Sequence, residues 1–178
     1  MARRVSFSGR QRELPEIAKH HRDLESSLTL YFSAASPNYL LRFNSYAANE
    51  VVDELRTRLE EVDLTSSLTV LTSLEAAFRI DYLQRCYLRG RDQVSRAFRS
   101  LYKSKQTRVS LEDEIFDVWA NHSAVAPSLI SELRGAFRFR HWLAHGRYWT
   151  PKLGRPYDYP DVFQLAEWTL GSFPFYGP

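Results

Sequence analysis

The sequence predicts an all-α fold, a bundle of five to seven helices forming one domain over residues 1–178. Three observations support this prediction. Apolar residues recur at helical spacing along most of the chain, and turn signals separate the periodic segments. With 44% hydrophobic and 14% aromatic residues, 178 positions can bury one sizeable core, and no internal repeat is present.

In the first half of the chain, a basic and flexible tail is expected to about residue 12. The next segment, to Tyr31, has helical spacing and is predicted as a helix, although the letters LTLYF are also compatible with a short strand. SPN at 36–38 indicates a turn. Two helices should follow, one from a Ser45 cap through 62 and one over 66–88, which ends before Gly90. The first of these should turn inward Val51, Val52, Leu55, Leu59 and Val62.

In the second half, QVSRAFRSLY reads as a short amphipathic helix with Lys and Arg on its outer face. Ser110 and Asp113 have capping-box spacing, which predicts a helix to about residue 121. The segment 127–145 should be helical, because Pro127 suits a first turn and Gly146 suits a C-terminal cap. YWTPKLGRPYDYP is predicted as a loop and DVFQLAEWTLG as a last helix.

Composition excludes several classes of protein. The 24 Lys and Arg against 21 Asp and Glu give a net charge of +3, which is too small to indicate a nucleic-acid binder by itself. The one cysteine, Cys86, cannot form an internal disulfide and fits a reducing compartment. No apolar run is long enough to span a membrane, and no signal peptide is evident at the start. A cytoplasmic protein is expected.

The segment RFRHWLAHGRYW, residues 138–149, carries a charged side chain where an apolar stripe should run. At about 100° per residue, Arg140 lies in the middle of the apolar stripe of its helix. One border of that stripe is wholly basic or titratable, with Arg134, Arg138, His141 and His145. Arg140 and His145 are about 140° and roughly 7.5 Å of rise apart, so they can reach one anion from two flanks.

A buried arginine needs a partner, because an unpaired charge in a core is costly. Glu75 lies inside the apolar stripe of the helix predicted over 66–88, and its carboxylate can hold a guanidinium in a fixed pose. We therefore expect an Arg140–Glu75 pair, with Asp81 as the second choice.

Charge is also distributed unevenly. Residues 133–157 contain no Asp or Glu, six Lys or Arg, and interleaved aromatic residues. Basic side chains attract phosphates and exposed rings can stack on unpaired bases, which favours single-stranded RNA over a duplex groove. The candidate RNA-binding residues are Arg134, Arg138, Arg147, Tyr148, Lys152 and Arg155.

Near the end of a late predicted helix, four residues separate Arg140 from His145. This spacing resembles the Arg-x4-6-His signature of the HEPN superfamily (higher eukaryote and prokaryote nucleotide-binding domains). RHWLAHG is similar to the family's Arg-polar-x-x-Ala-His-Gly pattern, with His141 in the polar position. The resemblance covers about seven residues, and the predicted helices extend it loosely. It implies a HEPN-like fold and a metal-independent endoribonuclease that acts as a homodimer in toxin or phage-defence systems, with a cognate antitoxin or defence partner.

The chemistry of these residues agrees with that implication. Metal-independent RNA cleavage needs a base, an acid and a cation for the charged phosphorane; a histidine can supply either of the first two and an arginine the third. A twofold axis beside the motif would bring a second His145 and Arg140 into one cleft. The purely structural interpretations are that Arg140 only stabilises the fold and that His145 only interacts favourably with the helix dipole.

Two alternatives remain: a non-catalytic nucleotide- or RNA-binding accessory, and an antitoxin-type interaction module. No cofactor is expected. His20, His21 and His122 have no evident partners at ligand spacing, so no metal site is predicted. Some HEPN toxins have a tyrosine two residues after the histidine; here Arg147 holds that position and Tyr148 follows, so regulation through that tyrosine is not expected.

Overall fold

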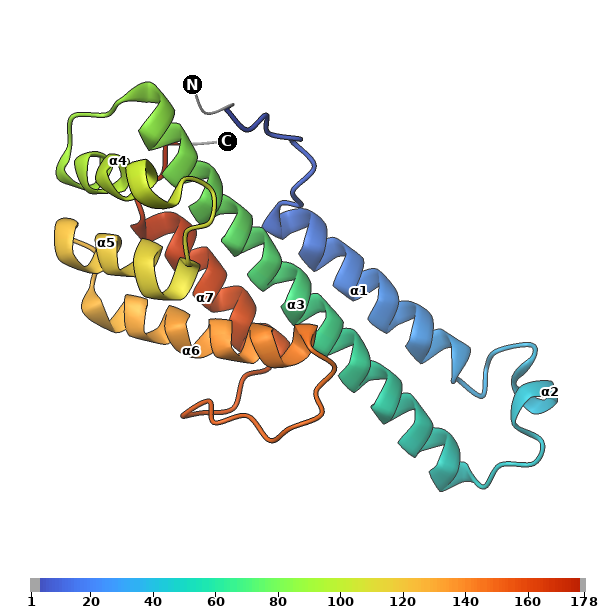
Figure 1. Cartoon of the computed structure of the whole chain (residues 1–178). Helices are drawn as coiled ribbons and strands as arrows, with labels where there is room; N and C mark the ends of the chain where they lie inside the picture. The colour runs from blue at the N-terminus through green and yellow to red at the C-terminus, as the bar shows by residue number, and fades with distance from the viewer. Residues whose placement is uncertain (1–3, 177–178) are drawn as a thin grey trace.

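The computed structural model describes residues 4–176, and this part of the chain is helical with no strand (Figure 1). The all-α prediction is confirmed. In chain order the elements are α1 (Leu14–Tyr31), α2 (Tyr39–Phe43), α3 (Ala48–Leu88), α4 (Gln93–Lys105), a π-helical turn η1 (Leu111–Ile115), α5 (Phe116–His122), α6 (Pro127–Ala144) and α7 (Tyr159–Ser172).

The central element is α3, a single helix of 41 residues. The two separate helices predicted over 45–62 and 66–88 are therefore wrong, since the chain does not break at its Ser/Thr-rich stretch. Thr65, Thr69 and Thr72 each donate a hydroxyl hydrogen bond to the carbonyl four residues earlier, at 2.8, 2.9 and 2.7 Å. These bonds satisfy the hydroxyls on carbonyls of the same helix, so the Ser/Thr-rich stretch can remain helical.

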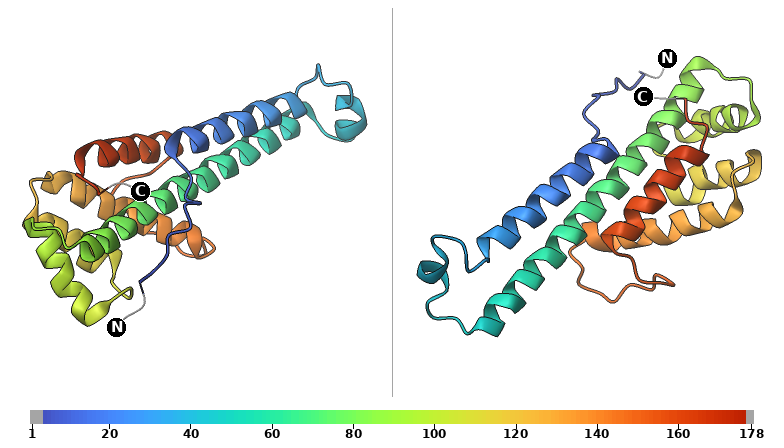
Figure 2. Two further views of the ribbon diagram at one scale, coloured as in Figure 1. Left: turned by 90° about the horizontal axis from the view of Figure 1, so that it is seen from above. Right: turned by 180° about the vertical axis from the view of Figure 1, so that it is seen from behind.

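The other helices are arranged around α3 (Figure 1). Helix α1 runs antiparallel beside it, α6 and α7 pack on another side, and α4 and α5 gather at its C-terminal end. The far half of the α1–α3 hairpin extends beyond the other helices, with the unpredicted α2 at its tip (Figure 2). Val52 lies in this extension and is 64% exposed, so the expectation that it faces inward is wrong.

The core lies where α3 meets the C-terminal helices. Its fully buried side chains come from α3, α4, η1, α5, α6 and α7 and include Leu71, Leu74, Phe78, Tyr82, Phe98, Ile115, Phe116, Trp119, Leu129, Leu133 and Val162. The segment after α7 closes this core, because Phe173 packs edge-on against both Phe78 and Trp119. The core therefore fixes α6, the helix that carries Arg140, against the middle of α3.

A buried ion pair anchors the C-terminal segment. Arg85 binds Asp81 one turn earlier on α3, at 2.8 Å, and both side chains are almost fully buried. Arg85 also donates to the carbonyl of Pro174 at 2.5 Å, and the backbone N–H of Tyr176 donates to Asp81 at 2.9 Å. The buried charges are thus paired and hydrogen-bonded, as their burial requires.

The N-terminal segment and several helix ends agree with prediction, but the predicted Ser45 cap is wrong, because α3 begins at Ala48 with Ala47 as its N-cap. Residues 4–12 are not helical, as expected, but they follow α3: Arg4 donates to the carbonyl of Tyr87 at 3.3 Å, and Ser73 donates to the carbonyl of Arg12 at 2.6 Å. The first three residues of the predicted tail lie outside the described residues. Ser110 caps η1 by accepting from the N–H of Asp113 at 3.2 Å, as its spacing predicts.

Candidate functional site

Helix α6 carries the residues of the Arg-x4-His motif. It begins at Pro127 and ends at Ala144, with His145 as the capping residue and Gly146 in a left-handed conformation at φ 84°. Its buried face points into the core, but that burial stops at Phe139. Arg140 therefore lies where the apolar stripe leaves the core, and its side chain is 29% exposed rather than buried in mid-stripe.

The predicted pair between Arg140 and Glu75 forms. Arg140 Nη2 lies 2.9 Å from Glu75 Oε2, and the other oxygen of Glu75 accepts from Nε of Arg79 at 2.8 Å. Arg140 Nε is buried and has no hydrogen-bond partner within the structure described. Asp81, the second choice, is committed to Arg85. Glu75 thus fixes the guanidinium of Arg140 through one of its nitrogens and leaves part of the group at the surface.

The two histidines of the motif lie side by side on the outer edge of α6. The ring centroids of His141 and His145 are 4.3 Å apart, and both residues are exposed. Trp149 covers one side of His141 at 5.8 Å, and its carbonyl accepts a 2.7 Å hydrogen bond from Nε1 of Trp142. Among the described residues, no hydrogen bond or ion pair joins Arg140 to His145, in agreement with their placement on two flanks of the helix.

A carboxylate that the sequence did not reveal lies beside this edge. Glu112 is part of η1, 29 positions before His141 in the chain, and is partly buried. Burial raises the pKa of its carboxyl, the charge of Asp113 adds to this rise, and the charges of Arg138, His141 and Arg134 act in the opposite direction. The Ser110 cap predicted the helical turn that contains Glu112, but no sequence signal placed Glu112 near α6.

The six candidate RNA-binding residues separate into two groups. Three arginines are held in ion pairs: Arg134 with Asp117 at 2.5 Å, Arg147 with Glu61 at 2.7 Å, and Arg155 with Glu132 and Asp161. Arg138, Tyr148 and Lys152 are exposed, and Tyr148 is 85% accessible. Within the structure described, these three side chains make no hydrogen bond or ion pair, so they are available to a ligand.

These ion pairs reduce the net positive charge of the surface formed by residues 133–157, which contain no acid of their own. Helix α3 supplies Glu61 and Glu75, α5 supplies Asp117, and α7 supplies Asp161, so acids from other elements reach four of its six basic residues. The surface is therefore less basic than the linear sequence suggests. Its unpaired positive charge is concentrated at Arg138 and Lys152, on either side of the histidines in the chain.

Other reactive groups lie elsewhere. Cys86 is buried in the core, and burial raises the pKa of its thiol to about 12, which disfavours the nucleophilic thiolate. The premise for excluding a metal site is wrong for His21, because ligand atoms of His21, Glu25 and Asp63 lie within 4.8 Å of one another. That cluster joins α1 to α3 and contains none of the motif residues.

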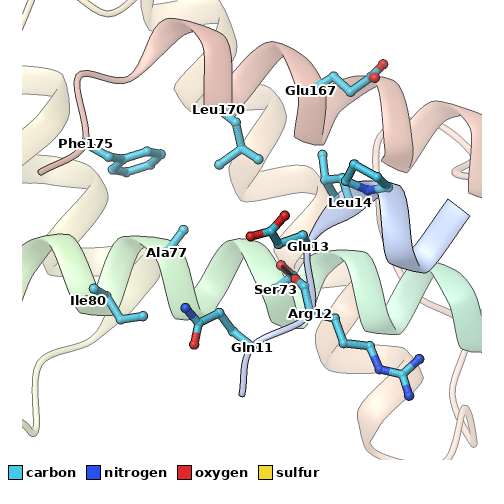
Figure 3. A pocket seen from close by; sticks show the side chains of 11 residues that line it. Gln11, Arg12, Glu13, Leu14, Ser73, Ala77, Ile80, Glu167, Leu170 and Phe175 are labelled. Carbon is cyan, nitrogen blue, oxygen red and sulfur yellow. Dashed lines mark hydrogen bonds between the residues drawn. The ribbon is translucent and has the colours of Figure 1, made fainter. Parts of the chain in front are cut away.

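A cavity of about 510 Å³ lies between the N-terminal segment, α3 and the end of α7 (Figure 3). Leu14, Ala77, Leu170 and Phe175 form much of its wall, and the carboxylate of Glu13 lies at its side. None of the residues predicted for RNA binding or catalysis lines it. The candidate site is thus the exposed edge of α6 and the loop that follows, not this cavity.

Comparisons with protein-family models, with curated proteins and with solved structures find no match for this chain. Among the described residues, no helix combines the length and the apolar character needed to cross a membrane.

Proposed function

We propose that the chain is a metal-independent endoribonuclease that cleaves single-stranded RNA and acts as a homodimer. The observation that carries this proposal is the pair of exposed imidazoles, His141 and His145, whose ring centroids are 4.3 Å apart. They lie on the same helix as Arg140, a partly exposed arginine that Glu75 holds in place. The resemblance to the HEPN motif supports the same activity.

The proposed reaction is a transfer of the RNA phosphate to the neighbouring 2′-oxygen. One histidine accepts the proton of the 2′-hydroxyl, whose oxygen attacks phosphorus and forms the new P–O bond. The bond from phosphorus to the 5′-oxygen breaks, and a protonated histidine donates its proton to that leaving oxygen. The products are a 2′,3′-cyclic phosphate and a 5′-hydroxyl. We assign His145 to this proton transfer, with His141 as the supporting group.

Arg140 is assigned to the phosphate. A guanidinium is always charged and can hold two phosphate oxygens at once, and it stabilises the extra negative charge of the phosphorane. The ion pair with Glu75 limits the freedom of the guanidinium, and the Arg140 side chain is still 29% exposed and can meet a phosphate. Arg138, Lys152 and Tyr148 are suited to bind the flanking nucleotides, the first two through phosphates and the third by stacking.

A second copy completes the proposed site. The side chains of Arg140 and His145 project from different flanks of α6. The two groups of a single chain therefore do not surround one phosphate. A twofold axis beside α6 would place the His145 of each copy opposite the Arg140 of the other. A toxin or phage-defence effector of this type would be held in check by a cognate antitoxin or defence partner.

The test is cleavage of total cellular RNA and a pool of single-stranded oligoribonucleotides in EDTA. The wild type should cleave, and Arg140→Ala and His145→Ala should each slow cleavage by about 100-fold or more. Arg56→Ala and His122→Ala are matched controls, because both residues lie outside the site, and should retain the wild-type rate. RNA that is bound but uncut would favour the non-catalytic RNA-binding accessory. No contact with RNA would contradict both and leave an interaction module.

A further inference from the structure

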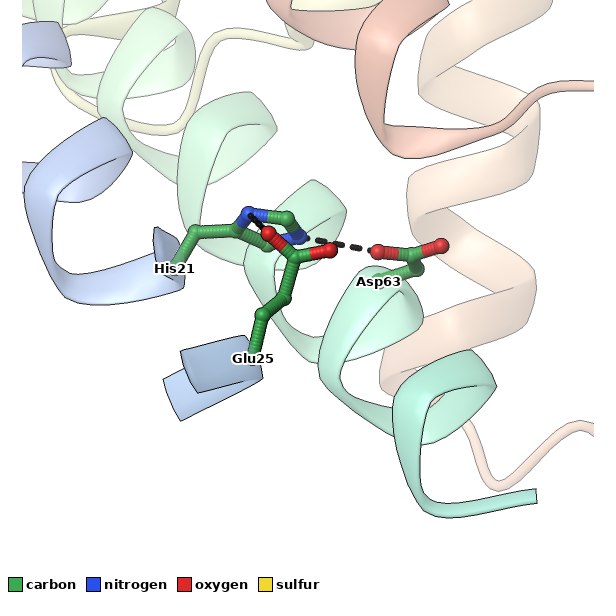
Figure 4. A group of neighbouring side chains, drawn as sticks. All are labelled: His21, Glu25 and Asp63. Carbon is green, nitrogen blue, oxygen red and sulfur yellow. Dashed lines mark hydrogen bonds and ion pairs between the residues drawn. The ribbon is translucent and has the colours of Figure 1, made fainter. Parts of the chain in front are cut away.

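Three potential metal ligands come together where α1 lies against α3, away from the motif on α6 (Figure 4). His21 and Glu25 are one turn apart on α1, and Asp63 comes from α3. His21 Nε2 lies 2.8 Å from Asp63 Oδ1, and His21 Nδ1 lies 3.3 Å from Glu25 Oε2. The two carboxylates thus contact different nitrogens of one imidazole, Asp63 at Nε2 and Glu25 at Nδ1, between two helices.

The imidazole is held in a fixed orientation. The His21 side chain is 7% exposed, and its ring stacks on that of Tyr159 with centroids 3.8 Å apart and planes 12° from parallel. The two carboxylates are different, because Asp63 is 42% and Glu25 is 45% exposed. The cluster therefore has a buried, stacked nitrogen donor on one side and two partly exposed oxygen donors on the side open to solvent.

The spacing of these atoms suits a small cation. Ligand atoms bound to one zinc ion at about 2.1 Å in tetrahedral geometry lie about 3.4 Å apart. Nε2 and Asp63 Oδ1 are already at 2.8 Å, and all three ligand atoms lie within 4.8 Å of one another. Glu25 contacts the ring without meeting hydrogen-bond geometry, so a rotation of its exposed side chain would bring an oxygen to the same cation.

We propose that His21, Glu25 and Asp63 bind a divalent transition-metal ion, Zn²⁺ in the first instance, that joins α1 to α3. Two carboxylates and a neutral imidazole provide two negative charges for a dication. A nitrogen donor favours zinc and its neighbours in the first transition row over Mg²⁺ and Ca²⁺, which prefer oxygen ligands only. Further coordination positions are open to water on the solvent side.

This site is structural and is independent of the proposed RNA chemistry. Its ligands tie the base of the extended α1–α3 hairpin, where Asp63 lies two positions after Glu61, the partner of Arg147. A bound ion would hold α1 in place beyond what the His21–Asp63 hydrogen bond achieves, because it adds Glu25 to the same centre. Binding to the folded protein alone would raise its thermal stability.

The experiment is a titration of the full chain with Zn²⁺ by calorimetry, alongside thermal unfolding. The wild type should bind one Zn²⁺ per chain and unfold at a higher temperature with the ion. Asp63→Asn and Glu25→Gln keep the side-chain shapes and should each weaken binding by at least about tenfold. Asp53→Asn removes an exposed carboxylate from the same helix and should bind like the wild type.

If the wild type binds the ion, a spectroscopic measurement shows whether these residues are its ligands. Co²⁺ in place of Zn²⁺ should give d–d absorption bands in the wild type and in Asp53→Asn, and these bands should be lost in Asp63→Asn. No binding by the wild type would overturn the proposal, as would equal affinity in all the variants, which would indicate adventitious surface binding. Either result leaves the RNA cleavage assay in EDTA untouched, so the two proposals fail separately.

Discussion

Arg147 and Glu61 form a two-pronged ion pair, with Nη1 2.7 Å from Oε2 and Nη2 3.1 Å from Oε1. Arg147 is two positions after His145 and adopts a left-handed backbone at φ 57°. The pair therefore ties the start of the loop over 146–158 to the middle of α3.

Glu61→Gln should loosen this loop and have little effect on the fold. Both side chains are more than a third exposed, so the free energy of unfolding should fall by less than about 1 kcal/mol. Hydrogen exchange over 146–158 should become faster, because the loop loses its attachment to α3. The exchanged pair Glu61→Arg with Arg147→Glu should restore slow exchange; if exchange is unchanged in the single variant, the pair does not position the loop.

Gly135→Ala should displace Tyr157 from α6. A Cβ at position 135 would lie 2.3 Å from the hydroxyl oxygen of Tyr157, which is too close for any contact. Overpacking of this kind costs about 1–3 kcal/mol, measured by urea unfolding, even though alanine otherwise favours a helix.

Two further variants test that explanation. Adding Tyr157→Phe removes the clashing oxygen and should recover most of the lost free energy of unfolding. Gly171→Ala, in α7, meets nothing within 4 Å and should be neutral or stabilising by up to about 1 kcal/mol. Equal losses in Gly135→Ala and Gly171→Ala would refute the steric account.

Asp92 should make the fold sensitive to acid. Partial burial pushes its pKa upward, but hydrogen bonds from Ser95 and Tyr176 and the charge of Arg85 outweigh this and hold the pKa well below the ordinary value of 3.8. A lowered pKa in the folded state stabilises the fold fully above 3.8, and that contribution is lost as the pH falls from there toward the folded-state value.

The measurement is the free energy of unfolding in urea between neutral pH and pH 3. Asp92→Asn should be less stable than the wild type near neutral pH, and the difference should shrink as the pH falls below about 4. Asp53→Asn, an exposed carboxylate on α3, should show the wild-type pH dependence. A difference that stays constant with pH would show that Asp92 acts as a neutral cap only.

The sequence predicted features that depend on a single helix, and features marked by a charged residue inside an apolar stripe. Arg140 and Glu75 both interrupt apolar stripes, and two charges that interrupt facing stripes have each other as natural partners. The ends of α6 followed from Pro127 and Gly146. In contrast, the end of α3 was predicted at the right place for the wrong reason. Gly90 was expected to end the helix as a capping glycine, but Arg89 adopts the left-handed conformation. Gly90 is instead needed for space, because a Cβ there would clash with Ser95 and Tyr176.

What the sequence could not predict is which distant residues come together. Glu112 comes close enough to feel the charges of Arg138, His141 and Arg134 only through the fold, because 22 or more positions separate it from them in the chain. The acids that neutralise Arg134 and Arg147 come from α5 and α3, so an acid-free stretch of sequence did not produce an acid-free surface. Likewise His21 and Asp63 are 42 positions apart, and their contact depends on how α1 lies along α3.

The measurement that tests the central claim most directly is the chemistry of the cleaved RNA ends, determined by mass spectrometry after incubation in EDTA. The wild type should leave 2′,3′-cyclic phosphate and 5′-hydroxyl ends, and a single 2′-deoxy substitution at the cleaved position should block the cut. His145→Ala should produce these ends at least about 100-fold more slowly. Ends with a 3′-hydroxyl and a 5′-phosphate, or undiminished cleavage by His145→Ala, would contradict the account.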